Sequence, residues 1–111
     1  MRMFAVIAAV VVLAFALACG SSGGGGGTGA TCPSGSKLTY SNFGQAFMDN
    51  YCVGCHQKFG SQAGVKADTS AIDSYAGSGP NSTNTSMPKS GTAPTDAERA
   101  QLSEWLACGA P

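Results

Sequence analysis

The residues best suited to chemistry lie close together near the middle of the chain, at Cys52, Cys55 and His56, in the pattern Cys-Val-Gly-Cys-His. Two thiols at this spacing can each add to one of the two vinyl groups of a single haem, and the adjacent imidazole is then fixed beneath the iron as an axial ligand. With the composition of this chain, the pattern arises by chance in about one sequence in five hundred. It therefore predicts covalent attachment of one c-type haem through Cys52 and Cys55, with His56 as an iron ligand.

Three other kinds of site use the same residues. A thioredoxin-like redox pair also has two cysteines at this spacing, but it requires strands alternating with helices, and no strand pattern surrounds Cys52. A zinc site requires a second ligand pair, for which Cys32 and Cys108 are the candidates. A structural disulfide between Cys52 and Cys55 would close a short, strained loop and would leave His56 unexplained. Haem attachment is the interpretation that uses all three residues.

The residues before the motif predict a helix that ends at it. Phe43, Phe47 and Tyr51 recur every four positions within Ser41 to Tyr51, which places them on one helical face. Ser41 or Asn42 can cap the first turn. The helix would therefore deliver Cys52 and Cys55 to a fixed position.

A second helix is predicted between Thr95 and Gly109. Thr95 and Glu98 have the spacing of a capping box, and Gly109 is typical of the residue that ends a helix. Its apolar face would consist of Leu102, Trp105 and Leu106. Between the two helices, the residues from Thr69 to Ala76 predict a short helix and those from Gly77 to Ser86 a polar loop.

These features together resemble the small monohaem c-type cytochromes of class I. That family typically has a glycine eight positions before the first haem cysteine and an aromatic residue four before it, both in contact with the C-terminal helix. Gly44 matches the first, and Met48 stands in place of the second. The family also carries an aliphatic and an aromatic residue three apart on the C-terminal helix, as Leu102 and Trp105 are. The resemblance implies an all-α fold of three to four short helices around one covalently bound haem, with two helices crossing at Gly44.

The same resemblance implies the sixth iron ligand. In the family, a methionine on the loop before the last helix reaches the iron from the face opposite the histidine, and Met87 lies on the corresponding segment. Pro88 restricts Met87 to an extended backbone, and a thioether is a soft, neutral ligand that favours reduced iron. Met48 is the rival ligand, but one turn before Cys52 it should face the C-terminal helix. A plain core methionine is the alternative role for Met87.

The N-terminal segment predicts export. Residues 1–18 contain one charge, at Arg2, followed by an apolar run that is short for a membrane-spanning helix. The small residues around Cys19 resemble a bacterial lipoprotein signal, which implies lipidation of Cys19 after cleavage. An ordinary secretory signal and an uncleaved anchor are the alternatives. Residues 19–31 are rich in Gly and Ser and predict a flexible tether, so residues 32–111 would form the folded domain.

The cytochrome resemblance and the predicted export also suggest a disulfide. With Cys19 assigned to lipid and Cys52 and Cys55 to haem, Cys32 and Cys108 remain. An exported protein meets an oxidising compartment, and the terminal helices of this fold cross. We therefore expect Cys32 and Cys108 to pair.

Composition limits the function further. The chain has 111 residues, a formal net charge of zero and only 11% charged residues, so one small domain without nucleic-acid binding is expected. The carboxylates are explained by solvated helix faces rather than by acid–base catalysis; they are Asp49, Asp68, Asp73, Asp96, Glu98 and Glu104.

The resemblance then implies a carrier of single electrons through a His/Met-ligated haem, rather than an enzyme. It would be anchored by lipid at the bacterial cell envelope, on the periplasmic or outer surface. It would act as a monomer, with redox proteins of unidentified type as partners. The alternative is a haem-based sensor or gas-binding module with an open or labile sixth site. Peroxidases of the c-type family usually carry two haem motifs, and this chain has one.

Overall fold

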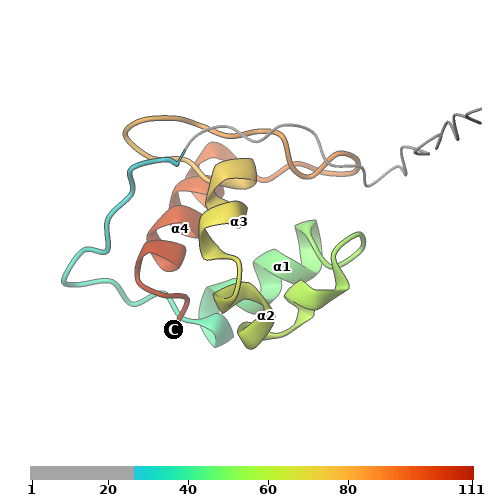
Figure 1. Ribbon diagram of the computed structural model, residues 1–111, viewed down its shortest axis with the longest axis horizontal. Helices are drawn as coiled ribbons and strands as arrows, with labels where there is room; N and C mark the ends of the chain where they lie inside the picture. The colour runs from blue at the N-terminus through green and yellow to red at the C-terminus, as the bar shows by residue number, and fades with distance from the viewer. Residues whose placement is uncertain (1–26) are drawn as a thin grey trace, which may run out of the picture.

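A computed structural model describes residues 27–111, and this part of the chain is helical, without strands. The all-α prediction is confirmed for these residues. Figure 1 shows α3 lying beside α4, with α1 to the right of α3 and α2 below it. The four α-helices are α1 (Gln45–Tyr51), α2 (Gln62–Lys66), α3 (Thr69–Ala76) and α4 (Asp96–Ala107). A π-helical turn (Tyr40–Gly44) precedes α1, and a 3-10 turn (Gln57–Gly60) precedes α2.

The first helical segment begins earlier than its periodicity predicted. Its cap is Thr39, not Ser41 or Asn42: the Thr39 hydroxyl accepts a hydrogen bond from the Asn42 backbone N–H, and the Asn42 side chain accepts one from the Thr39 N–H. This reciprocal pair satisfies two donors that a helix start leaves without partners. The first turn is π-helical, with the Gly44 N–H bonded to the Thr39 carbonyl. The end of α1 at Tyr51 agrees with the prediction.

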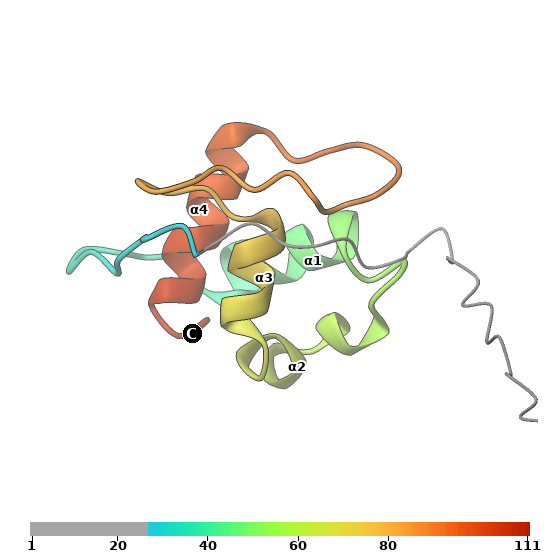
Figure 2. The ribbon, with the colours of Figure 1, turned by 45° about the horizontal axis from the view of Figure 1, so that its top comes forward.

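The predicted bounds of the last two helices are confirmed closely. Helix α3 spans Thr69–Ala76, and α4 begins after Thr95, whose hydroxyl and backbone N–H form the expected capping box with Glu98. Helix α4 ends before Gly109, which has a positive φ of 87° that glycine adopts without steric cost. The polar loop between α3 and α4 extends over residues 77–95 and arches over the helices in orange (Figure 2).

Gly44, the last residue of the π-helical turn before α1, lies directly against α4. A Cβ atom at this position would overlap the ring of Trp105, so the predicted contact of Gly44 with the C-terminal helix is confirmed. The Trp105 ring also contacts Tyr40 and Phe43, at centroid distances of 6.4 and 6.0 Å. The indole N–H donates to the Pro111 carbonyl at 3.2 Å, which gives this fully buried ring a polar partner. The contact fixes α1, and with it the start of the motif.

The core is small and includes residues of all four α-helices. Met48, Val65, Leu102 and Trp105 are each 0% exposed. Such a core stabilises a short chain only marginally without a further constraint or a bound group. The other buried apolar residues are Phe47, Ile72, Ala76, Leu106 and Ala110.

One such constraint is the disulfide between Cys32 and Cys108, whose Cα atoms lie 4.8 Å apart. The expected pairing of these two cysteines is confirmed. The backbone N–H of Tyr40 also donates to the carbonyl of Pro111 at 2.6 Å. The N-terminal side of the domain is therefore joined to the end of α4 by a covalent bond and a hydrogen bond.

The end of the predicted tether does not behave as free coil. Thr28 is fully buried, and its backbone N–H and hydroxyl both donate to the carboxylate of Asp73, at 2.9–3.0 Å. Its carbonyl accepts a hydrogen bond from Asn81 in the loop after α3. The prediction of a flexible segment over residues 19–31 is thus wrong at Thr28, where backbone and side chain both find partners in the domain.

The interpretation of the carboxylates as solvated also needs correction. Asp73 accepts hydrogen bonds from Thr28 and from the Ser103 hydroxyl on α4, so it joins three segments. Glu98 accepts one from the Tyr51 hydroxyl at 2.9 Å.

The predicted signal over residues 1–18 and the predicted lipidation site at Cys19 lie outside the described residues. Among residues 27–111, no helix is long and apolar enough to cross a membrane.

Candidate functional site

The motif folds as a tight turn at the end of α1. The His56 N–H donates to the Cys52 carbonyl at 2.8 Å, and the Cys55 N–H donates to the same carbonyl at 3.2 Å. The Phe59 N–H then bonds to the His56 carbonyl and begins the 3-10 turn. This backbone arrangement positions Cys52, Cys55 and His56 on one side of a cleft.

The cleft has a volume of about 510 Å³ and brings all four predicted haem-binding residues together. Cys52, Cys55 and His56 line it from the motif, and Met87 lines it from the loop between α3 and α4. Apolar side chains form much of the remaining wall, notably Phe59, Ile72 and Tyr75. The volume lies within the range of roughly 300–1,000 Å³ typical of small-molecule and cofactor sites.

No family model, curated protein or solved structure is similar to this chain. What the site can do therefore follows from its own residues. Their types fit a c-type haem: two cysteine sulfurs at the spacing of the vinyl groups, an imidazole beside them and a thioether on a separate segment. The apolar wall suits the faces of a porphyrin.

The two candidate iron ligands, Met48 and Met87, occupy different environments. Met87 is half-buried and lines the cleft, whereas Met48 is fully buried in the core cluster with Trp105 and is not among the cleft-lining residues. Met48 thus lies on the side of α1 that packs toward α4, as the helical spacing predicted. Of the two, Met87 is placed to reach a group in the cleft.

The backbone of Met87 is held on both sides. Its N–H donates to the Tyr75 carbonyl at 3.0 Å, and its carbonyl accepts a hydrogen bond from the Arg99 guanidinium at 2.9 Å. Arg99 was not predicted from the sequence as part of the site. The signal that could have found it is its position three residues before Leu102 and seven before Leu106, which places a cation on the buried face of α4.

The Cys52 thiol lacks the character of a redox-active cysteine. Burial raises its pKa to about 11, and the nearby Arg99 charge only partly opposes that effect. Reactive cysteines of thioredoxin-like sites have lowered pKa values, because the thiolate is the nucleophile. The raised pKa and the helical surroundings both argue against that alternative.

The two motif cysteines are not bridged to one another. Cys52 is a free thiol, so the structural disulfide between Cys52 and Cys55 is not formed. Cys55 is disulfide-bonded, but not to Cys52. Cys55 could form a thioether only after its disulfide is reduced to a free thiol.

The zinc alternative finds no support in residues 27–111. They contain no group of three His, Cys, Asp or Glu side chains close enough to hold a metal ion. Cys32 and Cys108, the candidate second ligand pair, are consumed by their disulfide.

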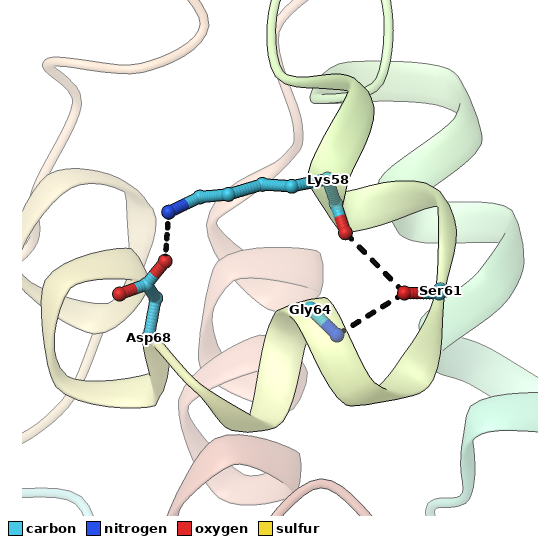
Figure 3. A network of polar contacts seen from close by, with 4 residues as sticks. All are labelled: Lys58, Ser61, Gly64 and Asp68. Atoms are coloured by element: carbon cyan, nitrogen blue, oxygen red, sulfur yellow. Dashed lines mark hydrogen bonds and ion pairs between the residues drawn. The ribbon is translucent and has the colours of Figure 1, made fainter.

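One edge of the cleft is lined by Lys58 and Asp68, which belong to a polar network with Ser61 and Gly64 (Figure 3). Lys58, on the 3-10 turn after His56, forms an ion pair with Asp68, which directly precedes α3. Helix α2 lies between Lys58 and Asp68 in the chain. The Ser61 side chain caps this helix by accepting a hydrogen bond from the Gly64 N–H at 3.1 Å. Because the Lys58 and Asp68 side chains are 60% and 30% exposed, the pair orders this edge more than it stabilises the fold.

The opposite end of the motif is tied to α4 by Tyr51 and Glu98. The Tyr51 hydroxyl donates to Glu98, and this hydrogen bond is the main reason that the pKa of Glu98 is lowered and that of Tyr51 is raised. A backbone hydrogen bond from Thr95 lowers the Glu98 pKa further. The end of α1 is thus connected to the first turn of α4.

Proposed function

We propose that this chain is a c-type cytochrome that binds one haem covalently and carries single electrons. The observation that supports the proposal most strongly is the cleft, in which Cys52, Cys55, His56 and Met87 converge from two separate segments. Each side chain has the chemistry that one position around such a haem requires. The all-helical fold, in which Gly44 lies against Trp105 of α4, is compatible with the proposal.

The residues of the cleft would have separate roles in binding the haem. Cys52 and Cys55 would hold the group by thioether bonds, and His56, positioned by the turn of the motif, would supply an imidazole ligand. Met87, on the separate loop between α3 and α4, would supply a thioether ligand. Phe59, Ile72 and Tyr75 would exclude water from the cleft. The bound haem supplies one-electron exchange at its iron, and no substrate-positioning acid or base is assigned to the protein.

Electron transfer is favoured over the sensor or gas-binding alternative by the way Met87 is held. A sensor requires a sixth site that is open or opens readily. Here the peptide groups on both sides of Met87 are hydrogen-bonded, one to Tyr75 on α3 and one to Arg99 on α4. This arrangement favours a methionine that stays bound.

The place of action is proposed from the sequence of residues 1–31. A lipid at Cys19 would tether the domain to a membrane of the bacterial envelope, where it would exchange electrons with redox proteins as a monomer. Replacement of Cys19 by Ala should release the protein from the membrane fraction. Unchanged membrane association would instead indicate an uncleaved anchor.

Covalent haem attachment is the decisive test. Trypsin digestion of the protein isolated from its native host should release a peptide of residues 38–58, bounded by Lys37 and Lys58, whose mass includes one haem. Because both sulfurs are then thioethers, the mature protein should show neither a free thiol at Cys52 nor a disulfide at Cys55. A single variant, Cys52→Ala, provides the control, since its haem should be held by one bond only.

Absence of haem from this peptide would contradict the proposal. If the peptide of residues 38–58 carries no haem and haem is lost on acid–acetone extraction, the cytochrome assignment is wrong. The state of Cys55 in the same digest would then show whether the motif serves a disulfide.

A further inference from the structure

Arg99 is a buried cation with an unusual set of partners. Its side chain is 3% exposed, and among the described residues it forms no ion pair. Instead, its Nη1 atom lies 2.9 Å from each of three backbone carbonyl oxygens, those of Ala76, Asn84 and Met87. A charge removed from water is costly unless its donors are satisfied. Here the Nη1 donors are satisfied by main-chain carbonyls rather than by a carboxylate.

These three carbonyls come from separate parts of the chain, and two of the three residues, Ala76 and Met87, line the cleft. Ala76 is the last residue of α3, Asn84 lies in the middle of the following loop, and Met87 lies at the cleft. Other hydrogen bonds hold single points of this loop, from the Asn81 N–H to Thr28 and from the Met87 N–H to Tyr75. One guanidinium on α4 therefore fixes the end of α3 and two points of the loop relative to one another.

We propose that Arg99 is a positioning residue that fixes the backbone of Met87 and thereby sets how firmly Met87 closes the sixth coordination position of the haem. The inference rests on the proposed haem function. Met87 is then held at two points, with its N–H on Tyr75 and its carbonyl on Arg99, so that only the side-chain torsions remain to be ordered when the thioether binds. A preorganised ligand loses less conformational entropy on binding than a free one.

The test compares two substitutions of Arg99 with a matched control. Arg99→Gln removes the charge and the forked donors, and Arg99→Lys keeps the charge with a different donor geometry. Ser103→Ala is the control, because Ser103 is also buried on α4 but donates its hydrogen bond to Asp73 rather than to the Met87 loop. All are prepared as haem-loaded proteins.

The readouts are the carbon monoxide affinity of the reduced protein and the reduction potential. The apparent affinity of a sixth-site ligand rises with the fraction of molecules in which methionine has left. For loss of a hydrogen bond to a charged group, Arg99→Gln should tighten carbon monoxide binding by roughly tenfold to a hundredfold. It should also lower the potential. Arg99→Lys should retain part of the wild-type behaviour, and Ser103→Ala should change neither quantity.

A purely structural role predicts a different pattern. If Arg99→Gln and Ser103→Ala lower the melting temperature similarly and neither alters carbon monoxide binding or the potential, the inference is overturned while the haem proposal stands. If Arg99→Gln does not fold, the same comparison is made with Arg99→Lys. Wild-type protein that carries no covalent haem overturns the proposed function, and the inference with it.

Discussion

Met87 is the residue whose exchange most directly tests the redox properties of the site. It lines the cleft from a segment remote from the motif, and its thioether would complete the iron coordination. Met87→Ala should leave haem attached at Cys52 and Cys55 but open the sixth position. Carbon monoxide should then bind readily. The potential should fall by an appreciable part of the roughly 0.8 V over which axial ligands tune haem iron. Absorption spectra and a redox titration provide the measurements.

The matched control is Met48→Leu, which keeps the size and polarity of a side chain packed in the core. It should change neither the spectrum nor the potential. An unaltered spectrum for Met87→Ala, together with a changed one for Met48→Leu, would reverse the ligand assignment.

Tyr51 and Glu98 should make stability depend on pH in a defined direction. The pKa of Glu98 is lowered in the folded protein, first by the hydrogen bond from Tyr51. Its contribution to stability is therefore present above the ordinary glutamate pKa of about 4.5 and is lost as pH falls through the lower folded value. The pKa of Tyr51 is raised, so its contribution is present below the ordinary tyrosine pKa and is lost as pH rises.

Tyr51→Phe should accordingly lower the melting temperature at neutral pH, and the difference from wild type should shrink as Glu98 becomes protonated. Thermal unfolding followed by circular dichroism between pH 3 and pH 7 measures this convergence. Tyr75→Phe, a change at another half-buried tyrosine of the cleft wall, is the control. A Tyr51→Phe difference that stays constant with pH would show that the hydrogen bond does not couple to Glu98 ionisation.

At the scale of the elements, the packing of the first helical segment against α4 depends on Gly44. Gly44→Ala places a Cβ atom within the volume of the Trp105 ring, so one helix must shift. We expect a loss of about 1–3 kcal/mol in the free energy of unfolding, as for other overpacked core sites. Denaturant titration measures it. Gly35→Ala is the control, because nothing lies within 4 Å of a Cβ at that position.

The helices illustrate which features a sequence makes visible. The bounds of α3 and the capping box of α4 depend on residues close together in the chain, so local patterns predict them. The contact of Gly44 with α4 was also predictable, but only through the resemblance to a known fold. The start at Thr39 was missed because a π-helical turn has no distinctive residue pattern.

The missed interactions have a common physical cause. Arg99 and Asp73 form most of their hydrogen bonds with groups far away in the sequence, and many of these groups belong to the backbone. A backbone carbonyl has the same chemistry at every residue, so the side-chain pattern does not reveal which one a buried guanidinium will meet. For the site itself, the motif and Met87 were predicted, whereas the groups that hold Met87 required the fold.

At the scale of the whole molecule, the disulfide between Cys32 and Cys108 should dominate stability. It closes a segment with a sequence separation of 76 residues. The chain-entropy model gives about 4–5 kcal/mol for such a loop. The double variant Cys32→Ser, Cys108→Ser should therefore melt at a clearly lower temperature while retaining its haem spectrum. Equal melting temperatures would show that the bond contributes nothing to the folded state.

This disulfide also gives the domain the covalent topology of a closed ring. The motif, α3 and Met87 all lie between Cys32 and Cys108, so every segment that lines the cleft belongs to the ring. A single cut of the backbone opens a ring without dividing it. The exposed stretch of residues 89–93 is where a protease would cut first. A molecule nicked there would remain one covalent unit, with both walls of the cleft still joined, until its disulfide is reduced.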